Sequence, residues 1–103
     1  MKRAVVIRPE AEQDLVDVQN WYESERRGLG IEFRHSVGEA ICSIAEFPLA
    51  APLMFAGIRR RLLSRFPYGL FYKAEAQRVV ILACVHAVRD PATVRTTVSG
   101  RKR

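Results

Sequence analysis

The stretch "RVVILACV", residues 78–85, decides the fold of this 103-residue chain. Residues alternate between the two faces of an extended strand, and here both faces are apolar. One face carries Val80, Leu82 and Cys84, and the other carries Val79, Ile81, Ala83 and Val85. A strand that is apolar on both sides lies in the middle of a sheet and is covered on both of its faces.

Segments 58–63 and 68–73 are predicted to form the two strands that precede it. "SRFP" (64–67) is the turn between them, because Pro67 cannot donate a hydrogen bond within a central ladder. "AEAQ" (74–77) forms the next turn. The segment 48–57 is predicted to be a loop, since its two prolines oppose regular structure.

The N-terminal half is predicted to contain one strand and two helices. "RAVVIR" (3–8) is β-branched, which favours a strand. The first helix starts near Pro9, where carboxylates follow at the positive end of the helix dipole. Its apolar stripe consists of Ala11, Leu15, Val18 and Tyr22. We expect Gly28 to supply a left-handed cap, and Trp21 to pack with Tyr22 in the core.

The second helix follows after only "GLG" (28–30) and is expected to end at Pro48. Its apolar stripe consists of Phe33, Val37, Ala40, Ile41, Ile44 and Phe47. Two helices joined by so short a link pack as an antiparallel hairpin. A hairpin covers only one face of the sheet, so something else must cover the second face. The last residues, 92–103, are expected to form a frayed basic tail.

The predicted order of elements is therefore β-α-α-β-β-β in one domain, residues 1–103. The fold class is α+β, with an antiparallel helical hairpin packed on one side of a small, mainly antiparallel sheet. A chain of this length has room for one hydrophobic core.

Charge is distributed unevenly along the chain, whose net charge is +6. Residues 1–46 hold six Lys and Arg against nine Asp and Glu, whereas residues 47–103 hold eleven against two. Most of the cations are arginine, which suits bidentate contact with carboxylate or phosphate. The basic half therefore predicts an acidic macromolecular partner, although a solvated basic face without a ligand would show the same pattern.

Cys42 and Cys84 both lie in apolar periodic stretches and are predicted to be buried, reduced thiols. With only His35 and His86 to join them, no metal site is predicted, and no pattern indicates a cofactor. No signal peptide opens the chain and no apolar run has membrane-spanning length. These features predict a cytoplasmic protein with no membrane partner.

Four segments carry a resemblance to a known family. They are "RPEAEQDLVDVQNWY" (8–22), "LGIEFRHSVGEAICSIAEFP" (29–48), "RRRLLSRFPYGLFYK" (59–73) and "VVILACVHAVRDP" (79–91). In this order and spacing the chain resembles the RelE/ParE superfamily of bacterial type II toxins, most closely its ParE branch. It departs from that branch at Ala87 and Val88, where a small and then a basic residue are more common.

The resemblance implies a toxin that is neutralised in a hetero-oligomer by a cognate antitoxin of the ParD-like or a related kind, with an acidic, amphipathic C-terminal segment. It also implies one of two targets. ParE-like members inhibit DNA gyrase by binding, arrest growth and take part in plasmid stabilization. RelE-like members cut mRNA on the ribosome.

The nuclease alternative has a specific candidate set, which is His86, Arg61 and Arg89. RNA transesterification requires an acid, a base and cations that stabilise the phosphorane. The resemblance also implies a basic residue after Tyr68 and a late tyrosine, but Gly69 follows Tyr68 and no tyrosine follows Tyr72. No catalytic residue is therefore assigned, and a binding protein without enzymatic activity is favoured.

The candidate residues for binding the target or the antitoxin come from the basic half of the chain. They are Arg59, Arg60, Arg61, Arg65, Tyr68, Tyr72, His86 and Arg89. Alternation predicts that Arg59 and Arg61 share the open face of the sheet and that Arg65 projects from the turn. Two structural alternatives stay open. Arg89, Asp90 and Pro91 could simply close the last strand, and the whole domain could be a degenerate toxin-fold module that binds only its antitoxin.

Overall fold

The computed structural model describes residues 2–101. Its elements are β1 (Ala4–Ile7), α1 (Pro9–Glu25), α2 (Leu29–Glu46), β2 (Leu53–Phe55), β3 (Ile58–Leu62), β4 (Tyr68–Ala74), β5 (Arg78–His86) and α3 (Pro91–Gly100). The five strands form one sheet in the order β1-β5-β4-β3-β2, in which only the β1–β5 pair is parallel. The predicted α+β class is confirmed, and β5 lies between two strands, as its apolar faces predict.

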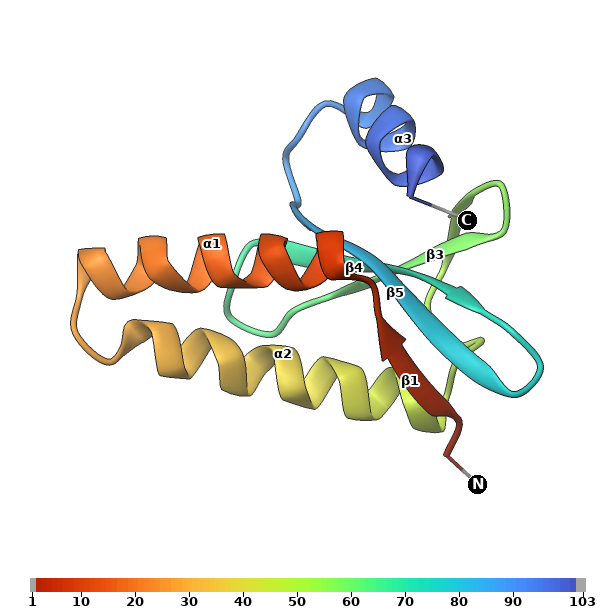
Figure 1. Ribbon diagram of the computed structural model, residues 1–103, viewed down its shortest axis with the longest axis horizontal. Helices are drawn as coiled ribbons and strands as arrows, with labels where there is room; N and C mark the ends of the chain where they lie inside the picture. The colour runs from red at the N-terminus through yellow and green to blue at the C-terminus, as the bar shows by residue number, and fades with distance from the viewer. Residues whose placement is uncertain (1, 102–103) are drawn as a thin grey trace.

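Helices α1 and α2 form the predicted antiparallel hairpin along one face of the sheet (Figure 1). Gly28 lies between them with φ of +90°, a left-handed conformation that glycine adopts without steric cost. The hairpin buries a core against the sheet whose largest fully buried members are Leu15, Phe33, Ile44, Leu70, Tyr72 and Ile81. The predicted core positions of Trp21 and Phe47 are wrong, since these residues are 55% and 59% exposed, although the Trp21 ring does pack edge to face on Tyr22.

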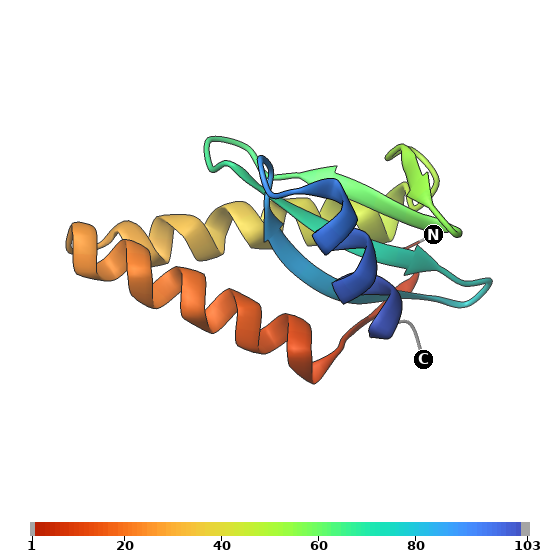
Figure 2. The same cartoon turned by 90° about the horizontal axis from the view of Figure 1, so that it is seen from above.

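The second face of the sheet is covered by α3 (Figure 2), and this helix was not predicted. Asp90 caps it by accepting a hydrogen bond from the backbone N–H of Thr93, and Pro91 occupies its first turn. One turn apart, Val94 and Val98 are buried against the sheet. This second core also contains Ile58, Phe71, Val80, Leu82, Ala83 and Val85.

The end of α3 is fastened to the rest of the molecule by Arg101. Its Nη1 donates to Asp14 Oδ2 at 2.6 Å and to the carbonyl of Leu82 at 3.3 Å. The same Asp14 oxygen accepts the backbone N–H of Cys84 at 3.1 Å. We call this group the Asp14 clasp. The expectation of a frayed tail is therefore wrong for residues 92–101, while residues 102–103 lie outside the described residues.

A β-bulge in β5 changes which side chains share a face. Phe71 pairs with Ala83 and Tyr72 pairs with Ile81, so Leu82 is an extra residue in the ladder. Beyond this point the alternation reverses. The predicted division is therefore wrong after Leu82: Cys84 lies in the hairpin-side core, and Ala83 lies in the α3-side core.

The segment predicted as a loop contains the short edge strand β2 after Pro52. Phe55 pairs with Ile58 across a two-residue turn, Ala56–Gly57, in which both residues have positive φ. Two positive φ values are the signature of a type I′ turn, whose twist suits a tight hairpin. Among residues 2–101, no helix has the length and apolar character needed to cross a membrane.

Candidate functional site

The three consecutive arginines of β3 lie on both faces of the sheet. Arg59 pairs with Tyr72 and Arg61 pairs with Leu70, and both partners belong to the core under the helical hairpin. Arg60 instead pairs with Phe71, which belongs to the core on the α3 face. Because directly paired residues point to the same side, Arg59 and Arg61 share a face as predicted, but it is the face under the helical hairpin and not the open face.

Arg59 and Tyr72 hold the connection between α2 and β2. The Arg59 Nη1 donates to the carbonyls of Leu49 and Ala51, at 3.1 and 2.7 Å. The hydroxyl of Tyr72 donates to the carbonyl of Pro48 at 2.8 Å, and burial raises the pKa of this fully buried side chain. Both residues were candidates for partner binding, and this geometry gives them structural roles.

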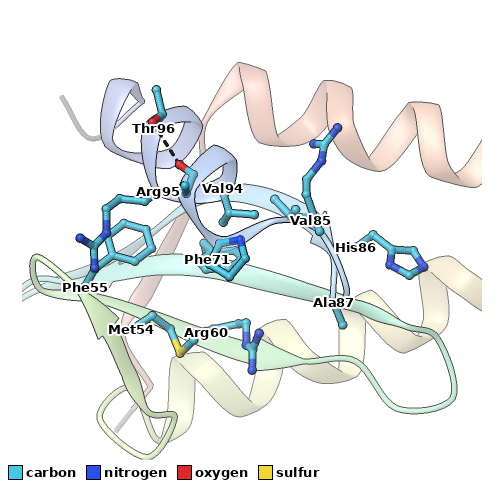
Figure 3. Close-up of a pocket in the computed structure, with 13 residues that line it drawn as sticks. Met54, Phe55, Arg60, Phe71, Val85, His86, Ala87, Val94, Arg95 and Thr96 are labelled. Carbon is cyan, nitrogen blue, oxygen red and sulfur yellow. Dashed lines mark hydrogen bonds between the residues drawn. The ribbon is translucent and has the colours of Figure 1, made fainter.

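A pocket of about 510 Å³ lies on the other face, between the sheet and the N-terminal part of α3 (Figure 3). Its lining residues are Met54, Phe55, Arg60, Phe71, Val85, His86, Ala87, Arg89, Pro91, Ala92, Val94, Arg95 and Thr96. The lining residues come from strands β2 to β5, from the connection between β5 and α3, and from α3 itself. We call it the α3 pocket.

The polar lining of the α3 pocket is cationic. Arg60, Arg89 and Arg95 line it, and none of its lining residues is Asp or Glu. Within residues 2–101, none of the three guanidinium groups has an ion pair with a carboxylate. The buried Nε of Arg60 has no hydrogen-bond partner among these residues, and the guanidinium of Arg95 lies 5.3 Å from the centre of the Phe55 ring. The pocket therefore carries uncompensated positive charge beside apolar surface.

The aliphatic part of the Arg60 side chain packs over Gly69. A Cβ at Gly69 would lie 3.0 Å from Cγ and 3.1 Å from Cδ of Arg60. Contacts this short require the neighbouring atoms to move, so the aliphatic part of Arg60 uses the space that glycine leaves across β4.

His86 and Tyr68 form a separate pair at the end of the sheet. Their rings meet edge to face with centroids 5.0 Å apart, and Tyr68 packs against the hairpin-side core. The Nδ1 of His86 accepts the backbone N–H of Val88 at 3.2 Å. In Figure 3 the His86 ring points away from the other labelled side chains of the α3 pocket. The Nδ1 of His86 is therefore occupied by a hydrogen bond to the backbone that follows β5.

Comparison with known proteins identifies the architecture. No protein-family model matches the chain, and neither does any curated protein. One solved structure, from the chromosomal ParDE toxin–antitoxin system of P. aeruginosa, matches with a TM-score of 0.73 and 15% identity over 82% of this chain and 96% of that one. The RelBE2 toxin–antitoxin complex of Mycobacterium tuberculosis matches with a TM-score of 0.59 and 23% identity, over 84% and 99% of the two chains. The chain has the RelE/ParE toxin fold.

Within this fold, the three residues predicted for a nuclease are not all brought together. His86 and Arg89 both line the α3 pocket, with the His86 ring against Tyr68, whereas Arg61 lies on the hairpin face. The sequence Asp90–Pro91 does not end the last strand in a simple turn, because it begins α3. Arg65 is exposed in the β3–β4 turn with φ of +71°, as its predicted projection requires.

Phe55 and Arg95 line the α3 pocket but were not among the residues predicted from the sequence. Both depend on elements that were not predicted, β2 and α3. A usable signal for α3 was present, since Asp90 followed by Pro91 and by Val94 and Val98 combines a capping residue with a helical period. Nothing comparable marks the three-residue strand β2 after Pro52.

The two thiols have different environments in this RelE/ParE fold. Cys84 is buried, as predicted, and burial together with the nearby Asp14 carboxylate raises its pKa to about 12. Cys42 is exposed, which contradicts the prediction. It lies on the solvent side of α2, because the buried residues Val37, Ala40 and Ile44 define the opposite side.

Proposed function

We propose that this protein is the toxin of a type II toxin–antitoxin module that inhibits DNA gyrase by binding and is held inactive in the cytoplasm by a cognate antitoxin. The α3 pocket carries the proposal, because three arginines that form no ion pair within residues 2–101 surround apolar surface on the sheet. Cationic, apolar surfaces of this kind are typical of protein-binding sites. The fold shared with chains from ParDE and RelBE2 systems supports the same class of function.

Inhibition by binding is favoured over RNA cleavage by the arrangement of the titratable groups. A nuclease requires an acid and a base within reach of one reacting phosphate. In this chain, His86 accepts a backbone N–H and lies beside Tyr68, while Arg61 is on the opposite face from Arg89. A gyrase inhibitor needs a complementary surface and no reacting group.

The antitoxin of the proposal is a short protein with an acidic, amphipathic C-terminal segment. The charge asymmetry supports this partner, because residues 47–103 hold eleven Lys and Arg against two Asp and Glu. Complementary charge would accelerate association and favour this pairing over others. Such a protein is expected to be encoded beside this chain and to suppress its effect on growth.

Purified protein tests the proposal in a DNA supercoiling assay. We expect gyrase supercoiling to fall and cleaved gyrase–DNA complexes to accumulate, with both effects reversed by the antitoxin. Unchanged supercoiling at an excess of this protein would exclude gyrase inhibition. Codon-positioned mRNA cuts that disappear in His86→Ala or Arg61→Ala would establish the nuclease alternative. A free protein that fails to arrest growth would instead be a module that only binds its antitoxin.

A further inference from the structure

We propose that residues 47–58 form the interface of a weak homodimer, in which this segment packs against the same segment of a second copy across a two-fold axis. The inference concerns self-association and is independent of the proposed function. The segment reads "FPLAAPLMFAGI", and none of its twelve side chains is charged or carries a hydroxyl, amide or carboxyl group. We call it the 47–58 surface.

Large apolar side chains of the 47–58 surface are exposed together. Phe47, Leu49 and Leu53 are 59%, 60% and 59% exposed, and Met54 is 39% exposed. Leu49 and Leu53 lie close to each other, because Arg59 donates to the carbonyl of Leu49 and pairs directly with Leu53. Clustered apolar exposure of this kind marks a site of contact with another protein chain.

The 47–58 surface is held in place by hydrogen bonds from the sheet. The Nη1 of Arg59 donates to the carbonyls of Leu49 and Ala51, at 3.1 and 2.7 Å. The hydroxyl of Tyr72 donates to the carbonyl of Pro48 at 2.8 Å. These bonds fix the backbone that carries the exposed side chains. A second copy therefore meets a surface that is already ordered, which lowers the entropy cost of association.

The distribution of charge favours a second copy as the occupant. With a net charge of +6, two copies of this chain repel each other, and they can approach at least cost where neither carries charge. The 47–58 surface meets this condition. An acidic protein or a nucleic acid gains little there, because the segment contains no cation and the neighbouring Arg59 already donates to its backbone.

The size of the 47–58 surface predicts a weak dimer. Its twelve residues are fewer than the roughly 20–30 that each partner contributes to a stable interface. Strand β2 has only three residues and follows Pro52, which limits pairing between edge strands, so the contact consists mainly of side chains. We therefore expect a dissociation constant on the order of micromolar or weaker. Met54 also lines the α3 pocket, so dimerisation would change one wall of that pocket.

Sedimentation velocity of the intact protein, at concentrations from about 5 to 500 µM, tests the inference. We expect the average mass to rise from that of one chain toward that of two. Leu53→Lys should raise the dissociation constant about tenfold or more, because it places like charges on both sides of the axis. Ile31→Lys is the matched control, since it makes the same change at a position of α2 that is 62% exposed, and should alter the constant less than about twofold. Circular dichroism checks that both variants fold.

Cysteine cross-linking locates the contact without adding charge. The exposed native thiol of Cys42 is first removed as Cys42→Ser. In this background we expect Leu53→Cys to form a disulfide with its own copy in the second chain under mild oxidation. Ile31→Cys, made in the same background, should remain mostly monomeric.

Three outcomes would overturn the inference. The first is a monomer at every concentration of the wild-type protein. The second is equal weakening of the dimer by Leu53→Lys and Ile31→Lys, which would indicate only added charge repulsion. The third is cross-linking of Ile31→Cys as fast as that of Leu53→Cys, which would place the contact elsewhere. None of these results depends on whether the protein inhibits gyrase.

Discussion

The two faces of the sheet are covered by different means. On one face, helices α1 and α2, of 17 and 18 residues, bury a continuous core with Phe33 and Tyr72 at its centre. On the other face, the 10-residue helix α3 buries Val94 and Val98 and leaves the α3 pocket beside it. The hairpin therefore covers its face of the sheet with a continuous core, whereas α3 covers the other face only in part.

The arginines of β3 differ in the same way. Arg59, on the hairpin face, uses its donors on the carbonyls of Leu49 and Ala51. Its neighbour Arg60, on the α3 face, has a buried Nε that finds no acceptor in the described part of the chain, residues 2–101. Neighbouring residues of the same type thus serve stability on one face and remain available to a partner on the other.

The largest test of this comparison truncates one core residue on each face. We expect Phe33→Ala to cost about 3–5 kcal/mol of the free energy of unfolding, because it leaves a cavity in the closed core. Val98→Ala removes the equivalent of two methylene groups and should cost about 1.6 kcal/mol. Denaturant unfolding of both variants gives the two values. Equal losses would show that both faces contribute alike to stability.

Asp14→Asn weakens the Asp14 clasp and is expected to lower the free energy of unfolding by less than Phe33→Ala does. Loss of the charge-assisted bond to Arg101 should cost about 1.5–3 kcal/mol and speed hydrogen exchange in α3 more than in α1 and α2. Uniform acceleration in all three helices would instead mean that α3 opens only with the whole domain.

The same variant also changes the pH dependence of stability. Burial and the Asp14 carboxylate raise the pKa of Cys84 from 9.0 to about 12, so the folded protein holds this proton more tightly than the unfolded chain. The resulting stability is complete below pH 9.0 and is lost as the pH rises toward 12. Asp14→Asn should lower the pKa of Cys84 and so reduce the loss of stability at high pH. Thiolate absorbance measures the pKa of Cys84, and denaturant unfolding between pH 9.0 and about 12 measures the stability.

The smallest effect is expected from the paired variants Arg59→Gln and Arg60→Gln. Arg59→Gln removes hydrogen bonds to two carbonyls and should cost about 1–2 kcal/mol. Arg60→Gln should change stability by less than about 0.5 kcal/mol, since among residues 2–101 it breaks no ion pair and removes a donor that has no acceptor there. Thermal unfolding side by side provides the measurement, and a larger cost for Arg60→Gln would mean that this arginine is structural.

Much of the fold is predictable from local pattern because periodicity and turn residues act over short distances. The helical period after Pro9 and the doubly apolar strand β5 are both present in the structure at nearly the predicted bounds. The short edge strand β2 is different, because its pairing depends on a hairpin turn that brings Phe55 beside Ile58. Such a strand has too few residues to show a period.

The faces of the arginines could not be predicted for a related reason. Alternation indicates which residues share a face, but it does not indicate which face lies under the helices. In the predicted strand 58–63 both alternating sets contain apolar residues. Leu63 follows Arg59 and Arg61 in one set, and Ile58 and Leu62 flank Arg60 in the other. The bulge at Leu82 adds a second difficulty, since one extra residue reverses the alternation for the rest of β5.

Because the side chain of Arg60 in β3 lies close to Gly69 in β4, substitutions at these two positions are expected to depend on each other. A Cβ at position 69 would lie 3.0 Å from Cγ of Arg60, a tight contact that the flexible stem of Arg60 must relieve by moving. Related sequences that place a cation at position 69 are consequently expected to carry a shorter residue at position 60 or an arginine whose stem takes another path. Mutational paths that shorten residue 60 first avoid this contact.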